Sequence, residues 1–195
     1  MVSAVLFATA VRCTTPWFPP DVHSLRYKQT TTVKGLDDVT LTMEWKDIRI
    51  GRDEVRMTAV TTNEGEEPTT VVKTFHCSAE GLTPVSDHVV MRGVQFGHNL
   101  AKGAEWKFTW SGTGIATSYI YTVEGQESVT VPAGTFRATR VRYFGVAISE
   151  TRGKLPTIRG TLWFVEGVGL VKSSEDDPAL GLVPDQSTMV LVEKK

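Results

Sequence analysis

The chain has 195 residues, of which 41% are hydrophobic and 22% are charged, a composition typical of a soluble globular protein rather than a disordered or fibrous one. Its 21 lysine and arginine residues are balanced by 22 aspartate and glutamate residues, which leaves a formal net charge of −1. The lack of a basic surplus argues against nucleic acid as a partner. The length suits one domain or at most two small ones.

The N-terminus carries an apolar run, Ala4–Val11, that is too short to span a bilayer. Its length suits the apolar part of a signal peptide, although the basic residues that usually precede such a run are missing. We therefore expect export to the periplasm or cell envelope, with residues 1–23 as a separate N-terminal segment. Two alternatives stay open. In the first, Cys13 is a lipid-modified membrane anchor, although Arg12 stands in the place of the usual small residue. In the second, the segment is a strand or tail of the folded chain.

Alternation of apolar and polar residues dominates the chain from Leu25 onward. In residues 39–46, Val, Leu, Met and Trp alternate with Thr, Thr, Glu and Lys, the period of two expected of a strand with one buried face. Similar runs follow at short spacing, separated by turn residues, and they predict about 10 or 11 strands. Only residues 173–185 are free for a helix, and their two prolines limit it to a turn or two. The sequence thus predicts one all-β domain over residues 24–195, as an antiparallel sheet, sandwich or barrel.

Residues 127–141, ESVTVPAGTFRATRV, predict a hairpin. In the turn Pro132-Ala133-Gly134, the proline suits the first central position of a type I turn and the glycine accepts a positive φ. We expect a three-residue loop with Val131 opposite Thr135, and a structural role for it, because it holds neither a nucleophile nor a metal ligand. The apolar positions change from even to odd numbers after Ala138, which predicts a β-bulge near residues 139–140.

No residues with the spacing of a catalytic or metal site emerge from the sequence. His76 and Cys77 are of metal-ligand type, but neighbours on a strand point to opposite faces, and neither has a partner at zinc-site spacing. The glycine-rich stretches 112–114 and 167–172 precede strand residues, not the helix that a phosphate loop needs. We therefore expect no enzyme activity, no cofactor and no metal. Cys13 and Cys77 permit at most one disulfide, and two cysteines are too few to indicate a compartment.

Large aromatic residues on the expected strands leave two interpretations of the interior. Core packing is favoured, because tryptophan buries a large apolar area and gives a curved sheet its bulk. The alternative is an apolar cavity that holds a lipid or another hydrophobic small molecule. The candidate ligand-binding residues of such a cavity are Trp45, Trp106, Trp110, Trp163 and Phe164. Since Trp163 and Phe164 are adjacent, one of them must point away from the other's side.

Three stretches, KGAEWKFTW (102–110), TVEGQESVTVPAGTFRATRVRY (122–143) and GTLWFVEGVGLVKSS (160–174), together resemble a pattern of uncharacterised bacterial exported proteins and lipoproteins, described as TapB-like or as a domain of unknown function. The pattern runs G-x-x-W, then G-x-E-x-V-x-V-P-A-G-T-F, then W-(Y/F)-x-x-G-V-G-L-V-K. The matching residues are Gly103, Trp106, Gly125, Glu127, Val129, Val131 to Phe136, Trp163, Phe164 and Gly167 to Lys172. The resemblance implies a bacterial cell-envelope location, no known enzyme activity, and a curved half-barrel similar in outline to lipoprotein carriers of the LolA type.

We therefore expect a single, strongly curved antiparallel sheet with little helix. A sheet of this length must curl, and two glycines within expected strands, Gly145 and Gly160, permit sharp local bending. The expected function is that of a non-catalytic cell-envelope protein that binds an apolar small molecule or lipid on the concave face. The alternative is a structural or interaction module that docks to another envelope protein through a sheet face or edge.

Overall fold

The computed structural model describes residue 13 and residues 15–18, 21–32, 37–177 and 185–195. These residues form an all-β structure without a helix, so none of them belongs to a helix that could cross a membrane. The apolar run Ala4–Val11, expected to be part of a signal peptide, lies outside the described residues.

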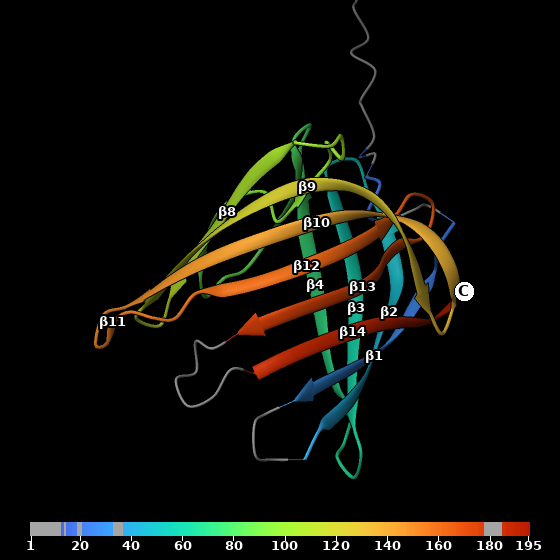
Figure 1. Cartoon of the computed structure of the whole chain (residues 1–195), viewed down its shortest axis with the longest axis horizontal. Coiled ribbons are helices and arrows are strands. Elements are labelled where there is room, and N and C mark those ends of the chain that lie inside the picture. The colour runs from blue at the N-terminus through green and yellow to red at the C-terminus, as the bar shows by residue number, and fades with distance from the viewer. Residues whose placement is uncertain (1–12, 14, 19–20, 33–36, 178–184) are drawn as a thin grey trace, which may run out of the picture.

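The described strands form one antiparallel sheet of 14 strands (Figure 1). The first seven are β1 (Ser24–Thr32), β2 (Val39–Ile50), β3 (Glu54–Asn63), β4 (Thr69–Cys77), β5 (Gly81–Pro84), β6 (Val90–Gly93) and β7 (Phe96–Gly97). The others are β8 (Glu105–Gly112), β9 (Ile115–Val131), β10 (Gly134–Ser149), β11 (Gly153–Lys154), β12 (Ile158–Val165), β13 (Gly169–Asp177) and β14 (Asp185–Lys194). The order is β6-β8-β9-β10-β12-β13-β14-β1-β2-β3-β4-β5-β7, with β11 paired to β10, so the first and last long strands of the chain, β1 and β14, are neighbours.

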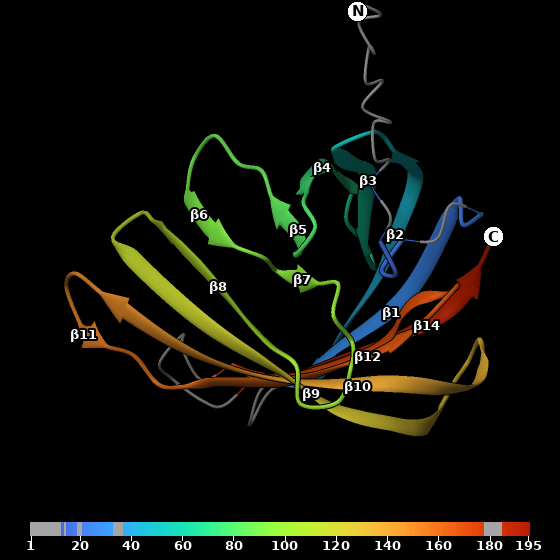
Figure 2. The same ribbon diagram turned by 90° about the horizontal axis from the view of Figure 1, so that it is seen from above.

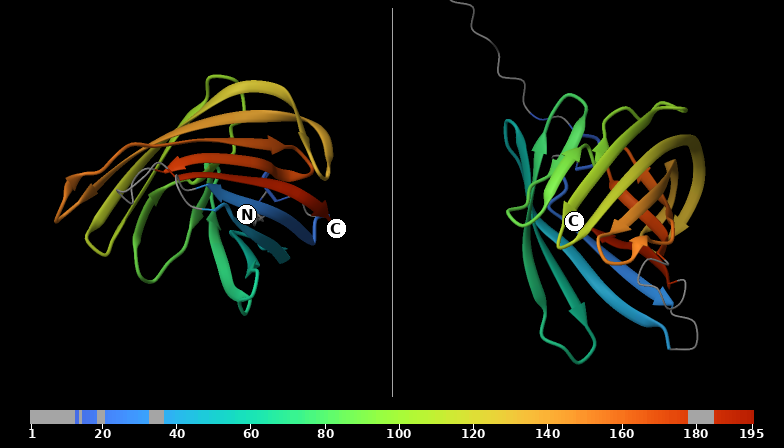
Figure 3. Two further views of the ribbon diagram at one scale, coloured as in Figure 1. Left: turned by 60° about the horizontal axis from the view of Figure 1, so that its bottom comes forward. Right: turned by 90° about the vertical axis from the view of Figure 1, so that its left-hand side faces the viewer.

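The two ends of this strand order are held by one short segment, residues 90–98. Its first part, β6, pairs with β8, and its last part, β7, pairs with β5. Between them the Val94 amide donates to the Lys107 carbonyl (3.2 Å) and the Gln95 amide to the Leu82 carbonyl (2.8 Å). The segment thus bonds to strands from both ends of the strand order. The sheet is curled, and its concave side is the inner face (Figures 2 and 3). The expected curved, single antiparallel sheet is confirmed.

The number of strands exceeds the expected 10 or 11 because several strands are short: β5 and β6 have four residues each, and β7 and β11 two each. Residues 81–93 form no continuous strand, because they are divided into β5, a connection over residues 85–89, and β6. β5 ends at Pro84, and past it one more bond to β4 forms, from the Val85 amide to the Thr74 carbonyl (2.9 Å). The edge of the sheet is therefore more broken than the alternation predicts.

β9 and β10 are the longest strands, with 17 and 16 residues. The register shifts between Arg140 and Val141, which confirms the bulge predicted near residues 139–140. The extra residue, however, is on β9: Arg140 pairs with Gly125 and Val141 with Val123, so Glu124 has no Cα partner in the ladder. Gly125 has a φ of +130°, which a side chain would strain. This bulge lets β9 continue through Gly125 as one strand.

The hairpin that joins β9 to β10 has the predicted glycine at positive φ, because Gly134 has a φ of +136°. The predicted loop length was wrong. Gly134 keeps its place in the ladder at this φ and pairs with Val131. Only Pro132 and Ala133 are therefore left outside the ladder, which makes a two-residue loop. The Ala133 amide donates to the Leu191 carbonyl (3.2 Å), which fastens the turn to β14.

The N-terminal segment supplies core residues, so the packed body begins earlier than the boundary expected at residue 24. The side chains of Trp17 and Phe18 are only 2% exposed. The Trp17 Nε1 donates to the Gly97 carbonyl (2.9 Å), and its ring packs against Phe164 with 4.5 Å between centroids. Alternation alone could not find these residues, because they lie outside any strand.

A disulfide joins Cys13 to Cys77, with Cα atoms 5.9 Å apart and a sequence separation of 64. The Cys13 amide donates to the Arg52 carbonyl (2.9 Å) and the Cys77 amide to the Asp53 carbonyl (2.7 Å), so both cysteines are held at the turn between β2 and β3. The Cys13 sulfur is therefore engaged within the fold, and the alternative that it anchors a lipid is not supported by this arrangement. The same bond also withdraws Cys77 from metal binding.

Candidate ligand-binding cavity

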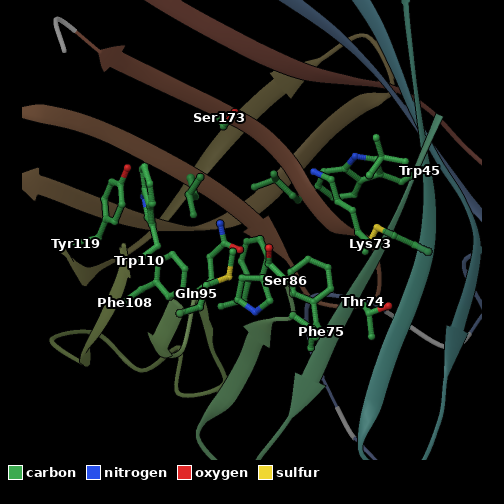
Figure 4. Close-up of a pocket in the computed structure, with 18 of the residues that line it drawn as sticks. Trp45, Lys73, Thr74, Phe75, Ser86, Gln95, Phe108, Trp110, Tyr119 and Ser173 are labelled. Carbon is green, nitrogen blue, oxygen red and sulfur yellow. The ribbon is translucent and has the colours of Figure 1, made fainter. Parts of the chain in front are cut away.

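A cavity of about 880 Å³ opens on the inner face of the curled sheet (Figure 4). This volume lies in the range of about 300–1,000 Å³ that is typical of small-molecule sites. Its aromatic lining residues are Phe18, Trp45, Phe75, Phe96, Phe108, Trp110, Tyr119, Tyr121 and Tyr143. Its methionines are Met43, Met57, Met91 and Met189, which are all the methionines of the chain except Met1.

Inner-face side chains change from apolar to polar along the strands that form one wall. On β1, Leu25 and Tyr27 are buried, whereas Gln29 lines the cavity. On β14, Leu191 is buried, whereas Ser187 lines the cavity. The Gln29 Nε2 donates to the Ser187 Oγ (2.9 Å), so these polar groups satisfy each other. Because side chains alternate along a strand, this gradient on one face gives the wall formed by β14 and β1 a hydrogen-bonding part, which we call the polar wall, next to the lining residue Met189.

Two strand glycines make room for the tyrosine rings of the cavity. Gly160 is paired with Tyr143, and a Cβ at Gly160 would lie 2.2 Å from that ring. Gly145 is paired with Tyr119, and a Cβ there would lie 2.7 Å from its ring. The two glycines therefore do more than permit bending, because each vacant side-chain position is covered by an aromatic ring of the neighbouring strand.

The tyrosines meet a carboxylate at the polar wall. Tyr121 and Tyr143 pack with 5.4 Å between ring centroids, and the Tyr143 hydroxyl donates to the Glu175 carboxylate. Burial raises the pKa of Tyr121, and the nearby Tyr119 and Glu175 raise it further. Burial, followed by the charge and hydrogen bond of Glu175, raises the pKa of Tyr143. The two phenols therefore stay protonated and do not act as bases, and that of Tyr143 serves as a hydrogen-bond donor.

One cation points into the cavity from β4 (Figure 4). Lys73 lies between Val71 and Phe75 on the inner face of the strand and pairs with the buried Met57 of β3. These surroundings lower the pKa of its ammonium by desolvation, although the side chain remains accessible through the open cavity. A charge in this place is unusual, because the neighbouring inward positions are apolar.

Exposed valines lie at and beside the mouth of the cavity. Val71, Val72 and Val85 line it, and Val90 is next to the lining residue Met91; all four are 50–57% exposed. They belong to β4, to the connection of residues 85–89 and to β6, which are the elements near the interrupted edge of the sheet. The opening thus offers apolar surface to an entering molecule.

The structure separates the five residues predicted to bind a ligand. Trp45 and Trp110 are among the lining residues, as Figure 4 shows. Trp106 covers Gly97 and stacks on its cross-strand partner Tyr121 with 5.3 Å between centroids, so it packs beside a lining residue without being one itself. Phe164 belongs to the core against Trp17, and Trp163 points to the opposite face, where its Nε1 donates to Glu127 and the Lys172 ammonium lies 4.8 Å from its ring. Only one of the adjacent pair faces inward, as expected.

Sequence reasoning missed the tyrosines, the methionines and Lys73. The signals were present. Tyr119 on β9 and Tyr143 on β10 each lie opposite a strand glycine. The inner-face run Val71, Lys73, Phe75 places a charge where alternation demands an apolar residue. Such patterns indicate a cavity only when the neighbouring strands are known, because a filled core uses the same residue types.

The arrangement can enclose an apolar molecule and hold its polar end, but its hydroxyls have partners other than a base. The Ser187 Oγ accepts from Gln29, and the Ser86 Oγ accepts from the His88 amide (3.2 Å). Within the described part of the chain no group of three or more His, Cys, Asp or Glu residues could hold a metal ion. The chemistry offered is therefore apolar contact, hydrogen bonding, the positive charge of Lys73 and the carboxylates of Asp87 and Glu175.

Comparison with known proteins supports the family resemblance in part. Residues 120–180 match the DUF3108-like family, and this range contains the second and third of the three stretches noted in the sequence. No curated protein matches the chain. The TapB-like label stays a prediction.

Two solved structures share the fold. One is a predicted exported protein with a YmcC-like fold from Bacteroides fragilis, with 15% identity and a TM-score of 0.61 over 93% of this chain and 100% of that one. The other is a predicted lipoprotein from Parabacteroides distasonis, with 18% identity and a TM-score of 0.59 over 93% of this chain and 99% of that one. At these identities the similarity establishes the curved antiparallel sheet and carries no residue-level function.

Proposed function

We propose that the protein is a non-catalytic component of the bacterial cell envelope that binds an apolar small molecule or lipid in its cavity. The observation that carries this proposal is the cavity of about 880 Å³, whose walls hold nine aromatic and four methionine side chains. Protein interiors are normally close-packed, so an apolar space of this size favours occupation by a ligand that removes the walls from water. Methionine side chains adapt to irregular shapes, which suits ligands of variable structure.

An envelope location is supported by two further observations. The disulfide between Cys13 and Cys77 is the kind of bond that forms and persists in oxidising compartments such as the periplasm. The names of the two structural neighbours describe a predicted exported protein and a predicted lipoprotein. Fractionation of the source bacterium, followed by thiol labelling before and after reduction, tests the location, and free thiols at both positions would contradict it.

The binding proposal is tested by fluorescence titration with methyl cis-parinarate, a neutral polyene ester. Ser173 lines the cavity and its neighbour Ser174 is not among the lining residues, although both belong to β13. Ser173→Trp should fill part of the cavity and weaken binding by about tenfold or more, whereas Ser174→Trp is the matched control and should keep the wild-type affinity within about twofold. Denaturation of both variants shows whether they are folded.

The proposal requires saturable binding by the wild type with a dissociation constant below about 100 μM, a range in which weak specific sites register. Absence of saturable binding would overturn it. Equal loss of binding in both tryptophan variants, with both folded, would place the ester outside the cavity and would also count against it.

The alternative of a docking module is supported by a patch on the opposite face of the sheet. Ile120 and Phe144 are paired across β9 and β10, and with Ile148 they are 42–56% exposed. A photo-crosslinking residue at position 144, expressed in the source bacterium, should then capture one envelope protein reproducibly, and Ile120→Asp should abolish the capture. A carrier without a docking partner gives no discrete crosslink.

A further inference from the structure

Lys73 is the one lysine or arginine among the described residues that line the cavity. It occupies an inward position of β4 between Val71 and Phe75, directly opposite Met57, a register in which every neighbour on its face is apolar. Figure 4 shows its long side chain reaching into the cavity. Lys73 is itself exposed through the open cavity, so a ligand that fills the cavity takes its ammonium out of water, at a cost in solvation free energy unless an opposite charge compensates.

The described residues do not offer Lys73 such an opposite charge. Their ion pairs involve other cations, and none of them includes Lys73. Two carboxylates line the cavity. Glu175 accepts a hydrogen bond from Tyr143, and Asp87 is exposed in the connection between β5 and β6. Partial removal from water lowers the pKa of the Lys73 ammonium, and a neighbouring anion would oppose that shift.

Given the proposed function, on which this inference rests, we propose that the ligand is an acyl chain with an anionic head group, carboxylate or phosphate, and that Lys73 binds the head. Lys73 lies near the exposed valines of the mouth, and Val71 and Phe75 flank it on the same face. The head group can therefore rest on the ammonium while the chain extends along the methionine and aromatic walls. The positive charge also orients the ligand, because the reversed pose would place the anion against apolar side chains.

A second interpretation of the same lysine must be separated from this one. β4 pairs with β5 only over Phe75 to Cys77. The preceding part of the strand, Thr69–Lys73, therefore has an open edge on the side that faces β5. Inward-pointing charges are one device by which proteins prevent such edges from pairing with other chains. In that case Lys73 suppresses self-association and has no role in choosing a ligand.

The experiment compares cis-parinarate with its methyl ester, two probes that differ in the charge of the head group. Binding is followed by probe fluorescence in the wild type, Lys73→Met, Lys73→Arg and Lys107→Met. Lys107 is the matched control, because it is an exposed lysine on strand β8 that does not line the cavity. Size-exclusion chromatography of each variant reports self-association, and displacement by oleate, oleoyl-lysophosphatidate or neutral monoolein identifies the head group.

We expect Lys73→Met to weaken binding of the carboxylate probe by about tenfold and to leave the ester within about twofold of wild type, since a charged hydrogen bond is lost only for the acid. Lys73→Arg and Lys107→Met should keep the preference for the acid. Stronger displacement by oleate than by monoolein assigns a carboxylate, and stronger displacement by the lysophosphatidate assigns a phosphate.

Three outcomes overturn the inference. If the ester binds and the acid has no advantage in the wild type, the anionic head is wrong while the cavity function stands. If Lys73→Met keeps the preference for the acid and self-associates, Lys73 protects the edge of β4. If neither probe binds, the proposed function itself fails.

Discussion

The inner face of the sheet has a filled half and a hollow half, and the division runs across the strands rather than between them. On β14 the buried Leu191 belongs to the filled half, and the earlier inward residues of the same strand, Met189 and Ser187, line the cavity. On β12 the buried Phe164 likewise belongs to the filled half, and the earlier residue Leu162 lines the cavity. A single strand thus contributes to a close-packed core at one end and to an open cavity at the other.

The difference between the halves lies in what covers them. The filled half receives Trp17 and Phe18 from the N-terminal segment, and these rings pack against Phe96, Phe164 and Phe75. The described residues that line the hollow half come from the sheet, its connections and Phe18 at the boundary. A strongly curved sheet without helices needs an added segment to complete its core, and where that segment ends the interior stays open.

The largest expected effect comes from removing the added segment's main side chain. Trp17→Ala deletes a fully buried ring and its hydrogen bond to Gly97, so we expect a loss of about 3–5 kcal/mol of unfolding free energy. Trp110→Ala, a matched change in the hollow half, should cost less than half as much, because its ring is only partly buried at the cavity wall. Urea denaturation measures both. Equal costs would show that the two halves are packed alike.

The disulfide fixes the N-terminal segment at the filled half. Replacing both Cys13 and Cys77 by alanine should lower the unfolding free energy by about 2–4 kcal/mol, because the bond closes a loop of 64 residues in the unfolded chain. Denaturation of the wild type with and without reductant measures the effect, and the double variant is the control that reductant must leave unchanged. Insensitivity of the wild type to reductant would mean that the segment is held without the bond.

The turn between β9 and β10 belongs to the filled half, because Ala133 bonds to the Leu191 carbonyl. Gly134→Val should cost about 1–3 kcal/mol, since a β-branched residue is strained at a φ of +136°. An added Cβ would meet the Phe136 ring only at 3.6 Å, so the cost comes from the backbone and not from a clash. Ala133→Val is the control and should change the denaturation midpoint little. An unchanged midpoint in the glycine variant would contradict the positive φ.

The smallest effect concerns pH. Burial raises the pKa of Tyr27 in the filled half, and burial and neighbouring groups raise those of Tyr121 and Tyr143 in the hollow half, above the ordinary value of 10.0. These phenols hold their protons more tightly in the folded than in the unfolded state, so their contribution to stability is complete below about pH 10 and is lost as pH rises further. Denaturation midpoints between about pH 8 and pH 11 should fall. Tyr143→Phe should flatten the decline, and a steeper decline in that variant would contradict the sign.

The sequence predicts the strands better than it predicts the interior. The alternation in residues 39–46 falls within β2, and the phase change after Ala138 locates a bulge. Alternation fails for Trp17 and Phe18, because burial outside a strand has no period. Alternation also cannot tell that Trp45 lines the cavity and Trp163 lies on the outer face until the strand register is known, since the five large aromatic residues suit core, cavity wall and outer surface equally. A cavity is a property of the distance between strands, which local alternation does not encode.

The central claim, that the hollow half holds an apolar ligand, is tested most directly by a crystal structure of the protein grown with methyl 12-bromododecanoate. The anomalous signal of bromine reports where the end of the chain lies without reference to its head group. We predict a single bromine site within the cavity, in contact with side chains such as Met57, Met189 and Trp110. A bromine site on the opposite face, beside Ile120 and Phe144, or a cavity filled by rearranged side chains, would contradict the account.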